Sequence, residues 1–262
     1  MIFKELTHKV IAIAKEAGAF ISDQRKTFTP DKIEFKGLND LVSYVDKTAE
    51  EKIVAALKNI IPGAGFLTEE KTINETGERY NWIIDPLDGT TNFIHGLPVY
   101  SVSIALQEFD ELVLGVVYEI NQDECFYAWK GSPAYLNGHE IKVSNTPTID
   151  KSLIGTGFPY YDFGKQSAYM ELFRELMRSC HGLRRLGSAA VDLVYTACGR
   201  FDAFYEYNLN PWDVAAGIVI VRQAGGEVVN FKGGDESLKT RELLATNGKI
   251  TEEMLNVIQK YF

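Results

Sequence analysis

The first part of the chain has the apolar spacing of amphipathic helices. Positions three and four residues apart line one face over residues 3–25 and again over residues 46–59. In the first segment these positions are Leu6, Val10, Ile13, Ala17 and Phe20, and in the second they are Ala49, Ile53, Ala56, Leu57 and Ile60. Proline follows each segment, at Pro30 and Pro62, and proline ends helices. The pattern predicts two helices before the first strand.

From residue 66 the pattern becomes that of β-strands. Short runs rich in β-branched and aromatic residues are separated by turn residues. They cover residues 66–68, 80–84, 99–109, 112–119 and 124–129, and the last three predict an antiparallel meander because their connections are short. Asn137-Gly138 predicts a hairpin between residues 134–136 and 140–143.

Beyond Pro147, predicted strands and helices alternate. The strands are expected at residues 152–157, 182–186, 201–206, 227–231 and 243–246, and the helices at 165–178, 188–198, 211–224 and 251–261. Pro211 suits the first turn of its helix, and Thr251 is expected to cap the last one. We therefore predict a mixed α and β fold in two parts, an N-terminal α+β half (residues 1–147) and a C-terminal α/β half (residues 148–262).

Composition is that of a globular protein, with 262 residues, 45% hydrophobic and 24% charged. No apolar run approaches the roughly 18 residues of a membrane helix, and the N-terminal segment does not resemble a signal peptide. We expect a cytoplasmic protein without a membrane partner. The net charge of −9 disfavours nucleic-acid binding, which usually needs a basic surface. Cys125, Cys180 and Cys198 lack zinc-site spacing, which predicts structural thiols.

Acidic residues stand at the ends of three predicted elements. Glu69 and Glu70 close a short strand, Asp85 and Asp88 follow another, and Asp213 lies in the first turn of a helix. Carboxylate oxygens suit hard divalent cations. The Gly-Thr-Thr segment after the second pair can open a helix whose first N–H groups suit a phosphate oxygen. Taken singly, each acid also fits a solvated loop, an ordinary turn or a helix cap.

Two long motifs carry a resemblance to a known family. The first is Trp82-Ile83-Ile84-Asp85-Pro86-Leu87-Asp88-Gly89-Thr90-Thr91-Asn92-Phe93, and the second is Asn210-Pro211-Trp212-Asp213-Val214-Ala215-Ala216-Gly217, followed by Ala224-Gly225-Gly226. Landmarks in the same order are Asp40-Leu41-Val42-Ser43 with Asp46, Glu69-Glu70, and Gly187-Ser188-Ala189-Ala190 with Asp192-Leu193. Over nearly its whole length the chain resembles the inositol monophosphatase family, and it looks most like the bacterial branch. The resemblance implies a layered αβαβα sandwich and a Mg²⁺-dependent, lithium-sensitive phosphatase.

The resemblance also implies a metal-binding set. A first Mg²⁺ is expected at Glu69, Asp85 and the Leu87 carbonyl, and a second at Asp85, Asp88 and Asp213, with Asp85 bridging. A third, weaker ion would lie near Glu69. Two metals about 3.5–4 Å apart can clamp the attacking and departing oxygens of an in-line displacement.

Catalytic and phosphate-binding residues follow from the same resemblance. Glu69 and Thr90 are expected to orient and deprotonate the attacking water, and Asp46 is the expected partner of the threonine hydroxyl. The N–H groups of Gly89, Thr90 and Thr91 are expected to hold the phosphate oxygens. No phospho-enzyme intermediate is implied, because the family uses direct attack by water.

The second half is expected to contact the leaving alcohol. By resemblance, Glu206, the Ala189 N–H and Asp213 would bind substrate hydroxyls, close to Asp88. Lys36 lies near the position of a family lysine, but the spacing is one residue shorter. The pair Arg184-Arg185 could approach a neighbouring subunit or the edge of the substrate, but a solvated pair is the preferred interpretation.

Three functions remain open at this stage. Inositol monophosphate or a similar sugar or polyol phosphate is the first substrate hypothesis. The same chemistry could act on fructose 1,6-bisphosphate, adenosine 3′,5′-bisphosphate or histidinol phosphate, although no lysine or arginine cluster for a second phosphate is evident. A regulatory role in binding a partner could accompany catalysis. The resemblance further implies a homodimer.

Overall fold

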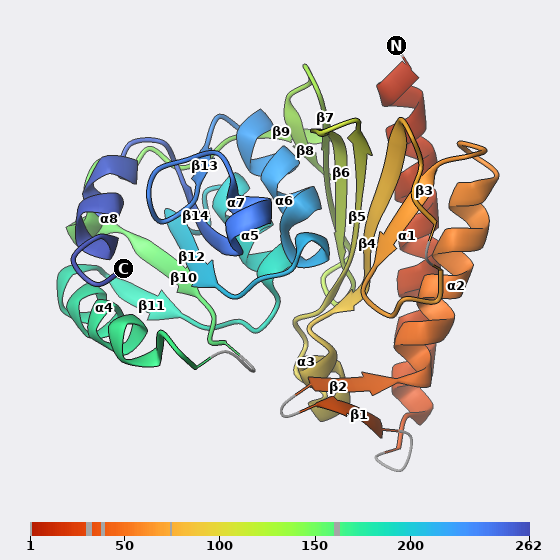
Figure 1. Cartoon of the computed structure of the whole chain (residues 1–262), viewed down its shortest axis with the longest axis horizontal. Helices are drawn as coiled ribbons and strands as arrows, with labels where there is room; N and C mark the ends of the chain where they lie inside the picture. The colour runs from red at the N-terminus through yellow and green to blue at the C-terminus, as the bar shows by residue number, and fades with distance from the viewer. Residues whose placement is uncertain (1, 30–32, 38–39, 74, 160–162) are drawn as a thin grey trace.

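Helices and sheets alternate in five layers. The computed structural model describes residues 2–29, 33–37, 40–73, 75–159 and 163–262, with the backbone alone for residues 2, 33–37 and 40–42. Its helices are α1 (Ile2–Thr27), α2 (Tyr44–Lys58), α3 (Thr90–His95), α4 (Gln166–Ser179), α5 (Ala189–Ala197), α6 (Pro211–Gln223), α7 (Ser237–Thr240) and α8 (Thr251–Ile258). Helices α1 and α2 cover one sheet, α5 and α6 lie between the two sheets, and α4 and α8 cover the other sheet (Figure 1). The predicted αβαβα sandwich is confirmed.

The larger sheet has seven strands. In spatial order they are β3 (Gly65–Thr68), β4 (Tyr80–Asp88), β5 (Ser101–Glu108), β6 (Glu111–Glu119), β7 (Glu124–Trp129), β8 (Ala134–Leu136) and β9 (His139–Ile141). From β4 to β9 each strand pairs antiparallel with the next, which confirms the predicted meander. Asn137 and Gly138 both have positive φ, as the predicted hairpin requires. Strand β3 pairs parallel with β4.

The smaller sheet has five strands from the second half of the chain. In spatial order they are β11 (Gly182–Arg184), β10 (Leu153–Thr156), β12 (Ala203–Tyr207), β14 (Glu242–Thr246) and β13 (Glu227–Val229). Strand β10 is parallel to both neighbours, whereas β14 is antiparallel to β12 and β13. Every helix and strand predicted after Pro147 is present, with ends that differ by up to three residues.

Burial explains where each helix lies. Helix α1 buries Val10, Ala14, Ala17 and Ile21, a stripe at helical spacing that faces the larger sheet and α2. Helix α6 is different, because every residue from 214 to 221 is buried. A helix that is apolar on all sides belongs between two layers, and α6 accordingly contacts strands of both sheets.

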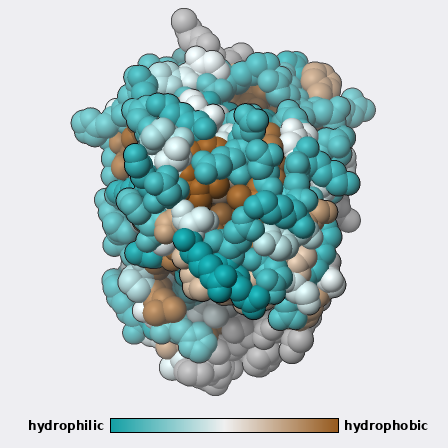
Figure 2. Space-filling view, turned by 90° about the vertical axis from the view of Figure 1, so that its left-hand side faces the viewer, coloured by the Kyte–Doolittle hydropathy of each residue, from teal (hydrophilic) through white to brown (hydrophobic). Residues whose placement is uncertain are grey.

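The outer helices of the smaller sheet are amphipathic. Helix α4 buries Tyr169, Leu172 and Leu176, and the positions between them are exposed or half-buried. The side of the molecule that carries α4 and α8 is mainly hydrophilic, with an apolar area near its centre (Figure 2). In the part of the chain that the structure describes, no helix combines the length and apolarity needed to cross a membrane.

Some local features differ from the sequence predictions, and one is the short helix α7 (Ser237–Thr240), which was not predicted. A two-stranded hairpin of β1 (Ile33–Gly37) and β2 (Asp40–Ser43) was not predicted, because four or five residues are too few to reveal a period. The predicted threonine cap at Thr251 is wrong, since Ile250 is the N-cap. The Asn247 side chain accepts the N–H groups of Lys249 and Ile250, and the Thr251 hydroxyl bonds to Thr246 instead.

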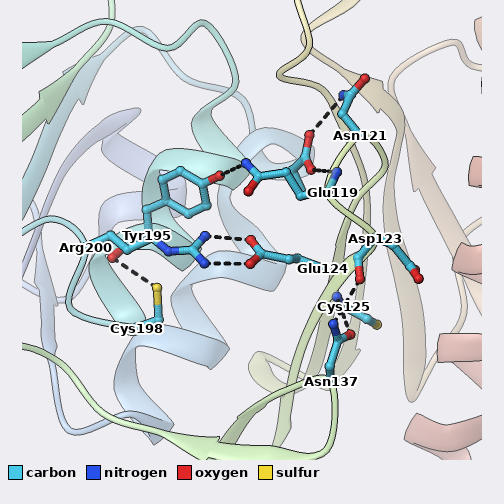
Figure 3. A network of polar contacts seen from close by, with 10 residues as sticks. Glu119, Asn121, Asp123, Glu124, Cys125, Asn137, Tyr195, Cys198 and Arg200 are labelled. Carbon is cyan, nitrogen blue, oxygen red and sulfur yellow. Dashed lines mark hydrogen bonds and ion pairs between the residues drawn. The ribbon is translucent and has the colours of Figure 1, made fainter.

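The predicted boundary near residue 147 is not tested by the structure and stays a prediction. What the structure does show is that contacts cross between the two halves. Arg200, just after α5, makes two bonds of 2.5 Å to Glu124 at the start of β7 (Figure 3). Its guanidinium lies 4.6 Å from the Tyr195 ring centre, and the Tyr195 hydroxyl accepts from Gln122 at 2.8 Å. This group of contacts ties the end of α5 to the larger sheet.

Replacing Glu124 by glutamine should therefore weaken the fold. The side chains of Glu124 and Arg200 are only 15% and 38% exposed, and a partly buried bidentate pair contributes more than a surface pair. We expect Glu124→Gln to lower the free energy of unfolding by about 1–2 kcal/mol in urea titrations. The control is Glu111→Gln, which breaks the exposed pair with Lys130 and should cost about 0–0.5 kcal/mol. Equal losses in both variants would contradict this assignment.

Candidate active site

A pocket lies where the larger sheet, the middle helices and the smaller sheet meet. It encloses about 830 Å³, part of it open to solvent. All the predicted metal and substrate residues line it, namely Glu69, Asp85, Leu87, Asp88, Gly89, Thr90, Thr91, Ala189, Glu206 and Asp213. Folding therefore brings together residues up to 144 positions apart, from Glu69 to Asp213. The predicted base partner Asp46 lies behind Thr90, outside the lining.

The end of β4 places two aspartates in the pocket. Asp85 pairs with Ser103 and Asp88 with Ser101, so the register shifts between them. Pro86, which has no N–H for the ladder, lies within this irregularity. The Asp85 Oδ1 accepts the Leu87 N–H at 2.9 Å, which fixes the direction of that carboxylate.

Gly89 then turns the chain into α3. Its φ of 96° is in the left-handed region, and a Cβ there would lie 3.0 Å from the Val99 carbonyl oxygen. Helix α3 begins at Thr90, so Thr90 and Thr91 form its first turn and line the pocket. The predicted helix opening at the Gly-Thr-Thr segment is confirmed.

Thr90 is held by a buried aspartate of α2. Its hydroxyl lies 2.8 Å from Asp46 Oδ1 and 2.9 Å from the Leu87 carbonyl oxygen, two acceptors for its single proton. Asp46 Oδ2 accepts from the N–H and the hydroxyl of Ser43 at 2.9 and 2.7 Å. Burial raises the pKa of Asp46, and the bonds from Ser43 and Thr90 oppose that shift. The predicted contact between Asp46 and Thr90 is confirmed.

Asp88 joins the larger sheet to the start of α5. Its Oδ2 accepts from the Ser188 hydroxyl at 2.6 Å and from the Ala190 N–H at 2.7 Å. Burial raises the pKa of Asp88 to about 6, whereas these bonds, the Ala189 N–H and the charge of Arg185 lower it. The Ala189 amide, predicted to reach a substrate hydroxyl, thus also faces Asp88.

Asp213 is a helix cap and a pocket residue at once. It is the third residue of α6, and its Oδ2 accepts the Asn210 N–H at 2.7 Å in a capping box. Burial raises the pKa of Asp213 to about 7, and the charge of Asp88 raises it as well. The hydrogen bonds from Asn210 lower it. The two interpretations of this acid from the sequence are therefore compatible.

Glu206 reaches the pocket from β12 and packs against a glycine. A Cβ on Gly157 would lie 1.9 Å from Glu206 Oε2, so only glycine leaves room for this carboxylate. Burial raises the pKa of Glu206 well above its usual value. The charge of Arg185 opposes that shift, and the charges of Asp213 and Asp88 add to it.

Negative charge dominates the site. Six carboxylates line the pocket, and among its lining residues in the described chain Arg185 is the only side chain with a fixed positive charge. Burial raises the pKa of Asp85 well above its usual value, and the charges of Glu69, Asp88 and Asp213 raise it further. Carboxylates this close together are neutralised by protons or by cations, and an all-oxygen donor set suits Mg²⁺.

The donor set fits the metals implied by the resemblance. All four acids line one pocket, and the carboxylates of Glu69 and Asp85 lie within hydrogen-bond reach of each other. Among the described residues, no three His, Cys, Asp or Glu side chains form a group already arranged to hold an ion. One oxygen of each aspartate accepts a backbone N–H, as described for Asp85, Asp88 and Asp213. Mg²⁺ would be held by the remaining aspartate oxygens, together with Glu69 and the Leu87 carbonyl.

Sequence reasoning missed two charged residues of the site. Arg185, interpreted as a solvated residue, lines the pocket, and its guanidinium lies 5.9 Å from the ring centre of Phe158. Asp192 was only a landmark of the resemblance, yet it is 1% exposed and also lines the pocket. Asp192 lies four residues after Ser188 and therefore on the same face of α5. This helical spacing could have predicted that Asp192 faces the pocket.

Lys36 belongs to β1, but its side chain lies outside the described residues, so its role stays a prediction. Cys125 is buried, and Cys180 and Cys198 are half-buried. All three are free thiols in the structure. His95 ends α3 and does not line the pocket.

The raised pKa of Asp213 predicts a pH dependence of stability. An acid whose pKa rises on folding, here from 3.8 to about 7, keeps its proton longer in the folded state. Wild type should therefore lose stability relative to Asp213→Asn as pH rises from about 4 to about 7, by at most about 1.4 kcal/mol per pH unit. Urea titrations without divalent cations would measure this difference.

The control for that titration is Asp110→Asn, which changes an exposed aspartate in the turn between β5 and β6. If wild type instead gains free energy of unfolding relative to Asp213→Asn as pH rises, the change has the wrong sign for a raised pKa. It would show that Asp213 is stabilised in its ionised form.

Comparisons with known proteins agree with the geometry of the pocket. Residues 3–261 match the model of the inositol monophosphatase family. An inositol-1-monophosphatase of Mesorhizobium japonicum is 37% identical over 256 residues, which cover 97% of this chain and 96% of that protein. The Nus factor SuhB of Escherichia coli is 40% identical over 248 residues, with coverage of 94% and 92%.

A solved structure shows the same fold. The extragenic suppressor protein suhB from Bartonella henselae superposes with a TM-score of 0.93 at 36% identity, covering 98% of this chain and all of the other. The match over nearly every residue includes both long motifs and all the pocket acids named above. The chain belongs to the inositol monophosphatase family, whose members are generally metal-dependent phosphatases.

Proposed function

We propose that the protein is a Mg²⁺-dependent phosphomonoesterase that hydrolyses inositol monophosphate to inositol and phosphate. The observation that supports this most strongly is the convergence of Glu69, Asp85, Asp88 and Asp213, from three separate elements, beside the first turn of α3. Mg²⁺ held by these carboxylates and by the Leu87 carbonyl would neutralise the phosphate charge and make water more acidic.

The residues of the chain would then direct a single displacement. A water oxygen would attack phosphorus as the ester P–O bond breaks, and the departing alcohol oxygen would take a proton from solvent water. Glu69 and Thr90 would orient and deprotonate the attacking water, since its proton can pass to the Glu69 carboxylate or to Thr90, whose own hydroxyl proton would go to Asp46 at 2.8 Å. The first-turn N–H groups of Gly89, Thr90 and Thr91 would hold the phosphate oxygens.

Acidic groups opposite the metal ligands favour a polyol as the leaving alcohol. Glu206 and Asp192 can accept hydrogen bonds from hydroxyl groups, and both lie close enough to Arg185 for its charge to act on them. A second phosphate would face these acids with Arg185 as its only cation among the described lining residues. The site therefore supports a monophosphate over fructose 1,6-bisphosphate or adenosine 3′,5′-bisphosphate.

Asp88→Asn should abolish this activity. The substitution keeps the shape of the side chain but removes a charge that the proposed second Mg²⁺ requires. We expect kcat for phosphate release from inositol 1-phosphate to fall at least about 10²-fold, and wild type to need Mg²⁺ and to be inhibited by Li⁺. A phosphate-release assay over inositol monophosphates, both bisphosphates and histidinol phosphate would measure this. Fastest turnover of a bisphosphate would reject the substrate, and full activity of Asp88→Asn with a chelator would reject the metal mechanism.

Glu206→Gln should change substrate preference and leave the chemical step largely intact. Glutamine keeps one acceptor oxygen where the carboxyl group has two, and its NH₂ group cannot accept from a hydroxyl, so KM for inositol 1-phosphate should rise about 10-fold. The KM for p-nitrophenyl phosphate, whose leaving group offers no hydroxyl donor, should stay within about 2-fold. A parallel rise for both substrates would show that Glu206 acts on the fold and does not read the alcohol.

A partner-binding role alongside catalysis is the second candidate, supported by the 40% identity to a protein named a Nus factor. Expression of this chain in an Escherichia coli strain that lacks SuhB would test it, with Asp88→Asn to separate the two roles. If wild type and Asp88→Asn both replace SuhB in that strain, binding independent of catalysis is supported, and if neither does, this role is rejected.

We also infer a cytoplasmic homodimer, for which light scattering should give twice the chain mass of 29.4 kDa.

A further inference from the structure

A second buried carboxylate of α2 lies next to the loop that carries Glu69. Glu50 is 0% exposed, and burial of an ionised group is costly unless donors surround it. Its Oε1 accepts from the Thr68 hydroxyl at 2.8 Å and from the N–H and hydroxyl of Thr72 at 2.8 and 2.7 Å. Its Oε2 accepts the Glu70 N–H at 2.8 Å. The donors that surround Glu50 thus come from one short loop.

These bonds hold the residues on both sides of Glu69. Thr68 precedes it and Glu70 follows it, and each donates to Glu50. The Glu69 N–H itself donates to the Ile84 carbonyl oxygen at 3.2 Å, in the strand that leads to Asp85. The backbone of Glu69 is therefore fixed from α2 and from β4, and its side chain lines the pocket.

Helix α2 presents Asp46 and Glu50 one turn apart. Residues at positions i and i+4 lie on the same face of a helix, and both carboxylates are buried. Asp46 bonds to Thr90, and Glu50 bonds to the residues that flank Glu69. Below them, the same helix is anchored in the core by Ile53 and Leu57. One rigid face thus supports both groups that the proposed function places at the attacking water.

We propose that Glu50 is a positioning residue that directs the Glu69 carboxylate into the metal-binding pocket. The proposal rests on the proposed function and deepens it, because it extends the machinery beyond the residues that would touch metal or substrate. Glu50 does not line the pocket, and its acceptor oxygens are directed at the loop. Residues that orient metal ligands typically change metal affinity 10- to 100-fold when they are replaced.

The test is Glu50→Gln, which keeps the size of the side chain. Glutamine has one acceptor oxygen and one NH₂ group, so its NH₂ must face a donor, either the Glu70 N–H or the three groups at Oε1. Glu119→Gln is the matched control. Glu119 is equally buried and also holds a loop, since it accepts from Asn121 and from the Gln122 N–H, but it lies outside the pocket.

Mg²⁺ binding is measured by calorimetry on the whole protein, without substrate. We expect Glu50→Gln to weaken binding about 10-fold or more, and Glu119→Gln to lower Tm without changing binding. In a Glu69→Gln background, Glu50→Gln should add little, because its effect passes through Glu69. Unchanged binding in Glu50→Gln, a loss equal to that in Glu119→Gln, or full additivity with Glu69→Gln would each overturn the proposal.

Crystal structures of wild type, Glu50→Gln and Glu119→Gln separate this proposal from the proposed function. The Glu69 carboxylate should be turned out of the pocket in Glu50→Gln alone. If it keeps its direction, Glu50 does not position it, whatever the activity. If it turns while wild type releases no phosphate from any substrate, the proposed function fails and the positioning role stands.

Discussion

Repulsion between buried carboxylates is the constraint on which the rest of this structure depends. Three aspartates, Asp85, Asp88 and Asp213, lie with Glu69 in one pocket, and each is desolvated. Burial raises the pKa of all three, and the charges of neighbouring carboxylates raise those of Asp85 and Asp213 further, so the group needs compensation. The chain supplies only part of that compensation, so the pocket is suited to bind cations.

Backbone N–H groups supply the part of the compensation that the chain provides. Each of the three aspartates accepts one backbone N–H: Asp85 from Leu87, Asp88 from Ala190 at the start of α5, and Asp213 from Asn210. These bonds fix the side chains while leaving the carboxylates at the pocket. They also explain why the acids stand at a strand irregularity and at helix starts, where N–H groups have no ladder or helix partner.

The middle layer decides where such a pocket can exist. Helix α5 is tied to the larger sheet at both ends, by Asp88 with Ser188 at its start and by Glu124 with Arg200 just beyond its end. Its start therefore stays beside Asp88 of β4, and the helix packs against β5 and β6 of the larger sheet and β12 and β14 of the smaller one. Pocket residues of both sheets, such as Asp88 of β4 and Glu206 of β12, meet because α5 and α6 hold the two sheets together.

Sequence by itself determined the elements and the acids. Periodicity and residue type placed nearly all helices and strands, because they are properties of short segments. The motifs around Asp85 and Asp213 identified the pocket residues through their resemblance to a known family. Only the tertiary structure revealed that Arg185 faces the pocket and that Glu50 holds the Glu69 loop. The first depends on the direction in which a side chain points just after the edge strand β11. The second depends on contacts between α2 and a segment about 20 residues further along the chain. Neither a period nor a motif records such contacts, since they arise only when the layers pack.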